Sequence, residues 1–409
     1  MHVLSIAPIL PYPPNHGWRV RTWHLLRALA VDHEVTLLTW VAADEPPEHL
    51  DAVRNEIGRL IALPLGPAPM GKVARLRRHA AFLRGDLPTY VQAMFEERCL
   101  RGSRAGHDVT QALRELHASS PIDVVVFEEE AMRLMPELPL PQVPVAVHRL
   151  EVFEPLMREL RRQSILGRAY SPLEAPRWAD FDRSVLEGTD LIVSTSPQTV
   201  EALVPYHSGL PTTIVPNGVE LRRLRTPPAE ATDIAVLGTM DYGPNVDGAV
   251  WFVKHVWPLI RDRHPGCRVR IVGRDPVPAI RELHGPDVEV TGTVPDVAAA
   301  CEGVRVGVVP LRSGMGIKNK TLDFMSMGLP VVTTPPGAEG VAAGRADGLE
   351  VVDIDPALLA DAVSNLLANR VAAAALGDAA YAYVARWHSW QAIGTAYSQT
   401  LATLAAAPS

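Results

Sequence analysis

The stretch Arg312–Thr334, which reads RSGMGIKNKTLDFMSMGLPVVTT, constrains the fold of this chain more than any other. It follows the run Val304–Leu311, which is rich in β-branched residues and short, and which therefore predicts a buried parallel strand. Two glycines then predict a tight turn, and the apolar spacing predicts a helix over 320–327 that ends at Gly328. A second apolar run begins at Val331. The predicted unit is a strand, a glycine turn, a short helix and another strand.

The same stretch gathers charge at the predicted start of the helix. Arg312, Lys318 and Lys320 supply three cations, and Asp323 follows Lys320 by one helical turn. Backbone N–H groups and the positive end of a helix at the carboxyl edge of a parallel sheet bind phosphates. This pattern favours a nucleotide, with the diphosphate on the lysines and the ribose hydroxyls on the carboxylate. The alternative is that the lysines are merely solvated and that Asp323 is a helix-start charge.

Composition bounds the class of protein. The chain has 409 residues, of which 47% are hydrophobic and 21% charged, and this predicts a globular protein with room for two domains. The net charge of −7 argues against broad nucleic-acid binding. The three cysteines are far apart and indicate neither a zinc site nor disulfides. The opening MHVLSIA resembles a strand and not a signal peptide, and we expect a cytoplasmic protein, with the inner face of the membrane as an option.

Short apolar runs alternate with helical sequence along the whole chain, which predicts doubly wound parallel sheets. The predicted strands are 2–7, 34–40, 59–63, 122–127, 143–147, 191–194, 213–215, 234–237, 268–272, 288–290 and 349–353, besides the two named above. The polar linker 220–233 divides the chain near its middle. Asn245 is the expected N-cap of the helix that follows the first strand after this linker, and it predicts a second anion site.

Three features of the first half suggest function without deciding it. Gly17 lies at a strand-to-helix turn and is either a simple turn glycine or a point of close approach to a ligand. His148 follows a buried strand, where it could reach a ligand or serve a structural role. The basic, apolar-striped segment 71–106 is either an ordinary surface helix or a contact for an anionic membrane or a lipid diphosphate.

The pattern G-x-G-I-K-x-K-x-L-D-x-M-x-x-G-x-P-V-V-x-T resembles the donor-site motif of retaining glycosyltransferases of family four, of the bacterial group 1 type. The opening Gly238-Thr-Met-Asp-Tyr-Gly-Pro-Asn245 is similar to that of bacterial sugar transferases of this family. The resemblance implies the GT-B fold, in which two doubly wound Rossmann-like domains face a cleft. It implies an acceptor-side domain over 1–219, a donor domain over 220–387, and a terminal helix within 388–409 that packs back on the first domain.

The resemblance and the motif together predict the site residues. The expected catalytic residues are His148, Lys320 and Arg312. The expected donor-binding residues are Gly17, Asn245, Arg274, Gly314, Met315, Gly316, Lys318, Lys320, Leu322 and Asp323. The expected acceptor-binding residues are Arg149 and Glu151, since the segment from His148 to Glu151 resembles one that lines the cleft in the family.

The sequence departs from the family at three places. Met315 stands where the first glutamate of the family's Glu-x7-Glu signature touches the donor sugar, and Asp323 replaces the second glutamate. Met240 and Val246 stand near the places of an arginine and a lysine that bind the diphosphate in many members. The phosphate contacts are therefore expected to fall on Lys318 and Lys320, or on Arg312.

The predicted activity is transfer of a sugar from a nucleotide sugar to a hydroxyl acceptor with retention, in polysaccharide, glycoconjugate or natural-product biosynthesis. No cofactor and no metal are expected, and the acceptor could be a lipid-linked glycan. A nucleotide-sugar epimerase of the same fold is an alternative. A nucleotide-binding or NTPase module is another, because the run from Gly314 to Thr321 nearly matches a P-loop. Asp180-Phe-Asp182 and Asp353-Ile-Asp355 match the Asp-x-Asp of metal-dependent transferases.

Overall fold

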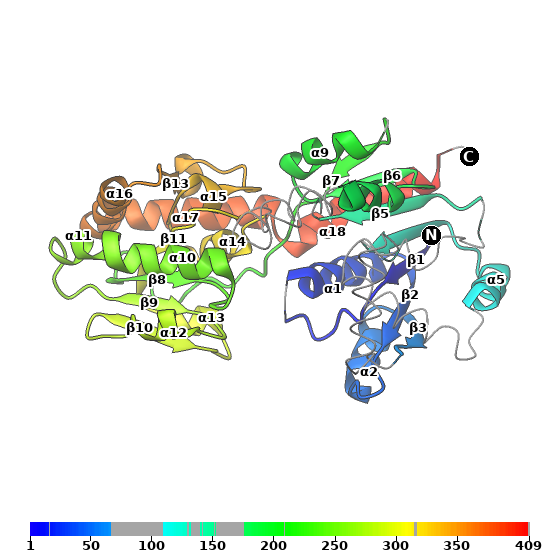
Figure 1. The fold of residues 1–409 in the computed structure, drawn as a ribbon, viewed down its shortest axis with the longest axis horizontal. Coiled ribbons are helices and arrows are strands. Elements are labelled where there is room, and N and C mark those ends of the chain that lie inside the picture. The colour runs from blue at the N-terminus through cyan, green and yellow to red at the C-terminus, as the bar shows by residue number, and fades with distance from the viewer. Residues whose placement is uncertain are drawn as a thin grey trace. The chain divides into compact units, whose positions relative to one another are not determined.

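The computed structural model describes residues 1–15, 17–66, 109–128, 131, 140, 142–150, 152, 176–207, 209–314 and 317–407. The chain divides into two compact units (Figure 1). The first consists of Met1–Val215 with Gly394–Ser409, and the second of Pro216–Ile393. Each unit alternates strands with helices, so the predicted α/β class is confirmed.

The described part of the first unit contains a seven-stranded sheet in the order β3-β2-β1-β4-β5-β6-β7. Its strands are β1 (His2–Ala7), β2 (Glu34–Val41), β3 (Arg59–Pro64), β4 (Val124–Glu128), β5 (Val145–Arg149), β6 (Leu191–Ser194) and β7 (Thr212–Ile214). All neighbouring strands are parallel. The strand β5 was predicted to end at Val147, and this is wrong: it continues through Arg149, with His148 opposite Glu128 of β4.

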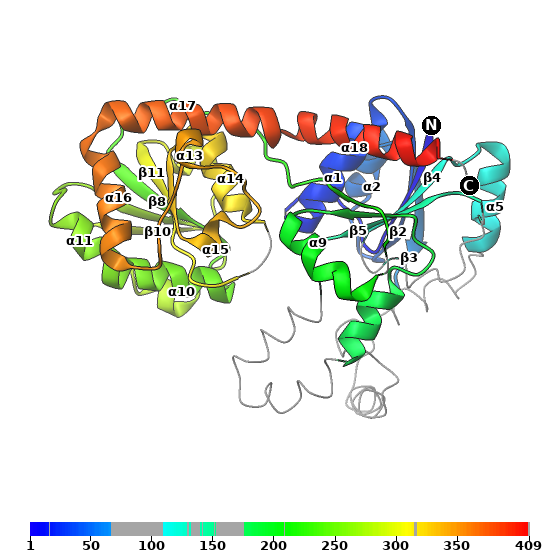
Figure 2. The same cartoon turned by 90° about the horizontal axis from the view of Figure 1, so that it is seen from above.

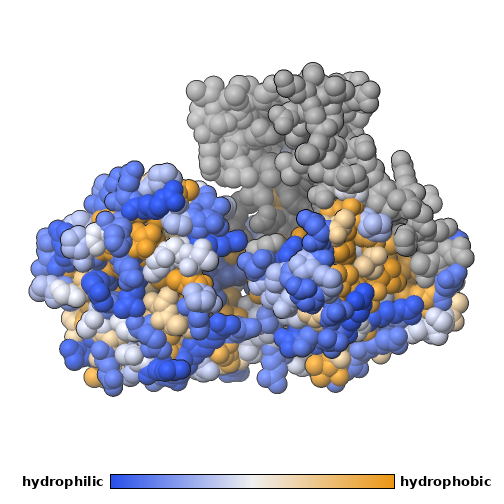
Figure 3. Space-filling model, turned by 90° about the horizontal axis from the view of Figure 1, so that it is seen from below, coloured by the Kyte–Doolittle hydropathy of each residue, from blue (hydrophilic) through white to orange (hydrophobic). Residues whose placement is uncertain are grey.

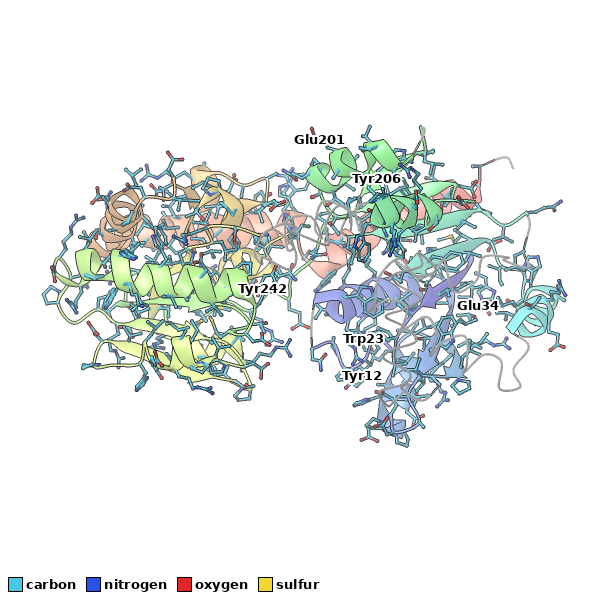
Figure 4. All side chains as sticks on the ribbon, in the orientation of Figure 1. Tyr12, Trp23, Glu34, Glu201, Tyr206 and Tyr242 are labelled. Carbon is cyan, nitrogen blue, oxygen red and sulfur yellow. The ribbon has the colours of Figure 1, made fainter. Side chains whose placement is uncertain are left out.

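The first unit has helices beside this sheet, and the first of them buries Trp23, Leu25, Leu26 and Leu29. The helices include α1 (Gly17–Ala30), α2 (Pro47–Glu56), α5 (Val109–Ser119), α9 (Pro197–Leu203) and the 3-10 turn η1 (Val204–Tyr206). Figure 2 shows the terminal helix α18 (Trp390–Ala405). Its residues Tyr397 and Leu401, one helical turn apart, are buried. Tyr12 and Trp23 lie close together after β1 and on α1 (Figure 4), with their ring centroids 5.0 Å apart.

The second unit contains, within its described residues, a six-stranded parallel sheet in the order β10-β9-β8-β11-β12-β13. Its strands are β8 (Asp233–Leu237), β9 (Val269–Val272), β10 (Val288–Gly292), β11 (Val304–Val309), β12 (Val331–Thr333) and β13 (Leu349–Val351). The predicted unit of strand, turn, helix and strand is present as β11, α14 (Asn319–Ser326) and β12. Gly328 adopts φ +74° immediately after the helix, as a C-terminal glycine does, so its predicted role is confirmed.

Helices cover both faces of this sheet. They are α10 (Gly243–Trp251), the π-helical turn η2 (Phe252–Val256), α11 (Trp257–Arg261), α12 (Pro278–Arg281), α13 (Val297–Ala300), α14, α15 (Pro335–Ala338), the 3-10 turn η3 (Arg345–Asp347), α16 (Pro356–Ala368) and α17 (Arg370–Trp387). Ile234 and Val236 of β8 pack in a cluster with α10, α11 and α16. The alternate residues Ala235 and Leu237 pack in another cluster with α14 and α17. This alternation buries β8 on both faces, as expected for a central parallel strand.

Among the described helices, none has the length and apolar character needed to cross a membrane. Most of the surface of the second unit in Figure 3 is hydrophilic, with apolar residues scattered over it.

Candidate functional site

The strand order of the second unit changes direction between β8 and β11, because β9 and β10 lie on one side of β8 while β12 and β13 lie beyond β11. In open parallel sheets, ligands bind outside the carboxyl ends of the strands at such a switch point. The segment after β8 leads into α10, and the segment after β11 leads into α14. Gly314, the described glycine of the predicted turn, therefore lies where this topology places a ligand.

Glycines allow these segments to approach one another closely. A Cβ at Gly248 of α10 would come 2.6 Å from the carbonyl oxygen of Pro310, which follows β11. A Cβ at Gly238 would come 2.7 Å from the Asn245 side-chain nitrogen. At Gly273, which follows β9, a Cβ would collide with the carbonyl of Gly238. Side chains at these positions would push the segments apart, so the glycines hold them together at the edge of the sheet.

Lys320 reaches from α14 to α10. Its ammonium donates a hydrogen bond to the Asn245 side-chain oxygen, while the Asn245 amide nitrogen donates to the carbonyl of Thr239 at 2.9 Å. The predicted N-cap role of Asn245 is wrong, since α10 begins at Gly243 and Tyr242 is its N-cap (Figure 4). Pro244 in the first turn favours that earlier start, because it needs no N–H partner there. The asparagine side chain instead joins the two segments.

Lys318 lies immediately before α14 and is buried, with 6% of its surface exposed. Its ammonium is 3.5 Å from a carboxylate oxygen of Glu339. It also lies near Gly314, where φ is +119° and where a Cβ would be 3.7 Å from the lysine nitrogen. Met315 and Gly316, both predicted to bind donor, lie outside the described residues. Gly314 and Lys318 therefore lie close together, and their contact with a donor stays a prediction.

Asp323 and Lys320 titrate close to neutrality. Burial raises the pKa of the Asp323 carboxyl to about 7, although Arg222 and Lys320 oppose this shift. Burial and the neighbouring charge of Lys318 lower the pKa of Lys320 to about 8, with Asp323 opposing. Within the described part of the chain, the Asp323 carboxylate makes no hydrogen bond or ion pair. A partly buried acid without a bonding partner is a candidate for ligand recognition.

Arg312 is occupied within the second unit. Its guanidinium forms two parallel hydrogen bonds of 2.9 Å with the carboxylate of Asp247, and it lies 6.0 Å from the ring centroid of Trp251. The ion pair raises the arginine pKa further. Arg312 is therefore paired with α10, whereas Lys318 and Lys320 lie at the start of α14.

Two further donor-binding predictions can be placed. Leu322 has no exposed surface and packs in the apolar cluster of the sheet, so the prediction is corrected for its side chain. The reason is helical geometry, because residues two apart, such as Lys320 and Leu322, point to different faces. Arg274 is exposed after β9, with its side chain 3.8 Å from Asp275, and its carbonyl accepts from the N–H of Met240. It stays a prediction.

His148 lies in a buried network of the first unit. One ring nitrogen is 3.2 Å from Glu128 of β4, and the other is 2.9 Å from the hydroxyl of Tyr397 of α18. Burial opposes ionisation of Glu128, but His148 and Arg21 overcome this effect and hold its pKa below the usual value. His148 has 0% of its surface exposed. The arrangement favours a structural role over the predicted catalytic contact, because both ring nitrogens face buried partners.

Arg149 is also fully buried, and its guanidinium is 2.5 Å from the carboxylate of Asp182. Its position within β5, and not in the loop after it, explains why its guanidinium pairs with a carboxylate of the protein. Glu151, the other predicted acceptor residue, lies outside the described residues, as does the basic segment 71–106. Gly17 is the exposed first residue of α1. Its contact with a donor stays a prediction.

The P-loop alternative does not fit the geometry. In a P-loop the hydroxyl after the lysine binds Mg²⁺. Here Thr321 is fully buried and its hydroxyl donates to the carbonyl of Gly337 at 2.8 Å. The Thr321 hydroxyl is therefore not placed as the Mg²⁺-binding hydroxyl of a P-loop.

The two Asp-x-Asp matches have other partners. Asp182 pairs with Arg149, and Asp355 caps α16 by accepting from the N–H groups of Ala357 and Leu358. In the described ranges, no cluster of three or more histidine, cysteine or acidic residues has metal-binding geometry.

Several residues of these networks were not predicted. Glu339 and Tyr397 contact predicted residues, and the charge of Arg222 acts on Asp323, from segments that carry no motif. Glu128 had a signal in the sequence, since it is the polar last residue of the otherwise apolar strand β4. Asn245 was singled out, but for a different contact.

Comparison with known proteins agrees with this topology. Residues 231–369 match the family described as "Glycosyl transferases group 1". Among solved structures, sucrose-phosphate synthase from Thermosynechococcus elongatus is similar with a TM-score of 0.68 and 18% identity, over 100% of both chains. Anabaena HepE in complex with UDP is similar with a TM-score of 0.67 and 11% identity, over 98% of this chain and 100% of that one. A complex of an S. aureus TarM mutant that contains UDP is similar with a TM-score of 0.65 and 9% identity, over 99% of this chain and 100% of that one.

A curated relative also matches part of the chain. It is a 44.6 kDa protein in the cps region of Klebsiella pneumoniae, 24% identical over 146 residues, which is 34% of this chain and 37% of the relative. The solved structures establish the two-domain fold, and the family match adds the identity of the domain that holds the α14 site. Together they show the fold of GT-B glycosyltransferases for this chain. Its residues 231–369 form a glycosyl transferases group 1 domain.

Proposed function

We propose that this protein transfers a sugar from a nucleoside diphosphate sugar to a hydroxyl acceptor with retention at the anomeric carbon, as family four transferases do. The observation that carries the proposal is the grouping of Lys318, Lys320 and Asp323 around the first turn of α14, at the switch point of the sheet. Two cations suit a diphosphate, and the unbonded carboxylate suits ribose hydroxyls. The similar HepE structures contain UDP and UDP-glucose, which supports a uridine nucleotide as the first probe.

In the proposed reaction, the bond between the anomeric carbon and the diphosphate oxygen breaks and the acceptor oxygen bonds to the same carbon on the same face. The acceptor proton passes to the departing phosphate oxygen. Lys318 and Lys320 stabilise the negative charge that grows on the diphosphate, and such preorganised charge contributes strongly to catalysis. We assign Arg312 a secondary role, because Asp247 already binds its guanidinium. His148 serves the fold of the first unit in this mechanism.

The test combines binding, turnover and product analysis. A thermal-shift panel of nucleoside diphosphates and nucleotide sugars identifies the base, and NMR of the product determines the anomeric configuration. Lys320→Ala should strongly reduce stabilisation by the diphosphate and lower turnover by about two orders of magnitude or more. Lys254→Ala is the matched control, because Lys254 is an exposed lysine in η2. Stabilisation by nucleoside triphosphates alone, or full turnover by Lys320→Ala, would overturn the proposal, and product formation without an acceptor would indicate an epimerase.

We further propose that the reaction needs no metal and that the chain acts on polysaccharide or another glycoconjugate at the membrane surface. Dialysis against a chelator tests the first point, since complete loss of activity restored by manganese would contradict it. Co-sedimentation with anionic vesicles tests the second, and a protein that stays in the supernatant would contradict it.

A further inference from the structure

We infer that Asn245 is a positioning residue that acts on the donor through Lys320: its side-chain amide fixes the ammonium of α14 next to the start of α10, where the diphosphate is to bind. The inference rests on the proposed function, and it assigns Asn245 a role different from direct contact with the donor. The two residues are 75 positions apart in the sequence and are joined by one hydrogen bond.

The orientation of the Asn245 amide is determined by its surroundings. The side chain is buried, with 7% exposed, and its nitrogen donates to the carbonyl of Thr239 at 2.9 Å. An amide has donors on one side and an acceptor on the other, so this bond turns the oxygen toward Lys320. A carboxylate could not make both bonds, because it has no donor for the Thr239 carbonyl.

The backbone around the amide is adapted to it. The nearest atoms to a Cβ at Gly238 would be the side-chain nitrogen, at 2.7 Å, and Cγ, at 2.9 Å, of Asn245. Gly238 follows β8 directly, so the amide packs over the end of a central strand. This arrangement leaves the asparagine little freedom, and a lysine held by it loses less side-chain entropy when a ligand binds.

A neutral partner also suits the charges that face Lys320. Lys318 disfavours its protonated form and Asp323 favours it, while Glu339 pairs with Lys318. An amide oxygen stabilises the ammonium through a hydrogen bond without cancelling its charge. A carboxylate at position 245 would neutralise the cation that a diphosphate requires.

A double-mutant cycle tests the inference with UDP as the probe, measured by isothermal titration calorimetry. Asn245→Ala should weaken UDP binding about tenfold in the wild-type background and less than twofold in the Lys320→Ala background. Equal losses in the two backgrounds would overturn the inference, because Asn245 would then act without Lys320. Asn365→Ala, on the exposed face of α16, is the control and should leave UDP affinity unchanged.

A second readout needs no nucleotide. The rate at which an N-hydroxysuccinimide ester acylates Lys320, followed by peptide mass spectrometry across pH, reports the midpoint of its titration. The midpoint should be highest in Asn245→Asp, intermediate in the wild type and lowest in Asn245→Ala, because the three side chains stabilise the ammonium in that order. Asn245→Asp preserves the size of the residue and serves if Asn245→Ala fails to fold.

The two readouts separate the possible failures. Identical midpoints in the wild type and the variants would overturn the pairing of Asn245 with Lys320, whatever UDP does. Shifted midpoints in a protein that binds no nucleoside diphosphate would establish the pairing and overturn both the proposed function and the donor role of Asn245.

Discussion

Binding of UDP should depend on pH with an optimum between the pKa values of Asp323, about 7, and Lys320, about 8. The diphosphate requires the protonated lysine, and the ribose requires the ionised carboxylate. The sign follows from linkage. A bound diphosphate favours proton uptake by Lys320, so affinity falls as pH rises through the lysine pKa, whereas affinity falls on the acid side as Asp323 gains a proton.

The magnitude of both limbs follows from these pKa values. Between pH 7.5 and pH 9 the protonated fraction of Lys320 falls about eightfold, and between pH 7.5 and pH 6 the ionised fraction of Asp323 falls about eightfold. Because the two groups interact, the limbs describe the pair and not either residue alone. We expect the affinity for UDP to fall by about these factors on each side of the optimum.

Calorimetric titration of UDP from pH 6 to pH 9.5, in buffers of different ionisation enthalpy, measures both the affinity and the protons taken up. Lys320→Arg should remove the alkaline limb, since arginine stays protonated throughout this range. Asp323→Asn should remove the acidic limb and lower the affinity at the optimum. An alkaline limb that persists in Lys320→Arg would refute the reasoning, because another group would then be the titrating cation.

Three other predictions concern stability and reactivity. Tyr397→Phe removes the hydrogen bond to His148 and should lower the free energy of unfolding by about 1 kcal/mol, measured by urea denaturation with activity as a control. Gly248→Ala should cost about 1–3 kcal/mol in the same assay, because the new Cβ would meet the carbonyl oxygen of Pro310 at 2.6 Å; a neutral change would contradict this packing. Burial raises the pKa of the Cys301 thiol to about 12, so it should react with a thiol reagent at pH 8 only after denaturation; rapid labelling of the native protein would contradict its burial.

The strands and the central helix could be predicted because their signals are local. The β-branched residues of 304–309 identify a buried strand without reference to the rest of the chain, and Gly328 determines the end of α14 through its own backbone conformation. The clustering of Lys318, Lys320 and Asp323 could be predicted for the same reason, since one helical turn connects them. The order of the strands within the sheets could not, because pairing between distant strands leaves no local pattern.

The partners of the site residues could not be predicted either. The pairs Lys318–Glu339 and His148–Tyr397 join segments that are 21 and 249 positions apart. The end of β5 depends on its register with β4. The strand ends two residues later than predicted, so His148 lies in the buried sheet and not in the expected loop. For polar side chains near the end of a strand, strand register therefore determines whether they lie in the sheet or in the loop after it.

A contact between distant segments also lets α14 supply the cation that many relatives are expected to place near the start of α10. Met240 is fully buried in the core, so no charge can be presented from that position without disrupting the packing of the second unit. Lys320 belongs to α14, but its ammonium bonds to Asn245, which is one residue before Val246. The cation therefore reaches the start of α10 although it does not belong to it. If this is correct, Val246→Lys in the Lys320→Ala background should restore part of the UDP affinity, and a variant that folds but binds no better would show that the position of the charge was not what mattered.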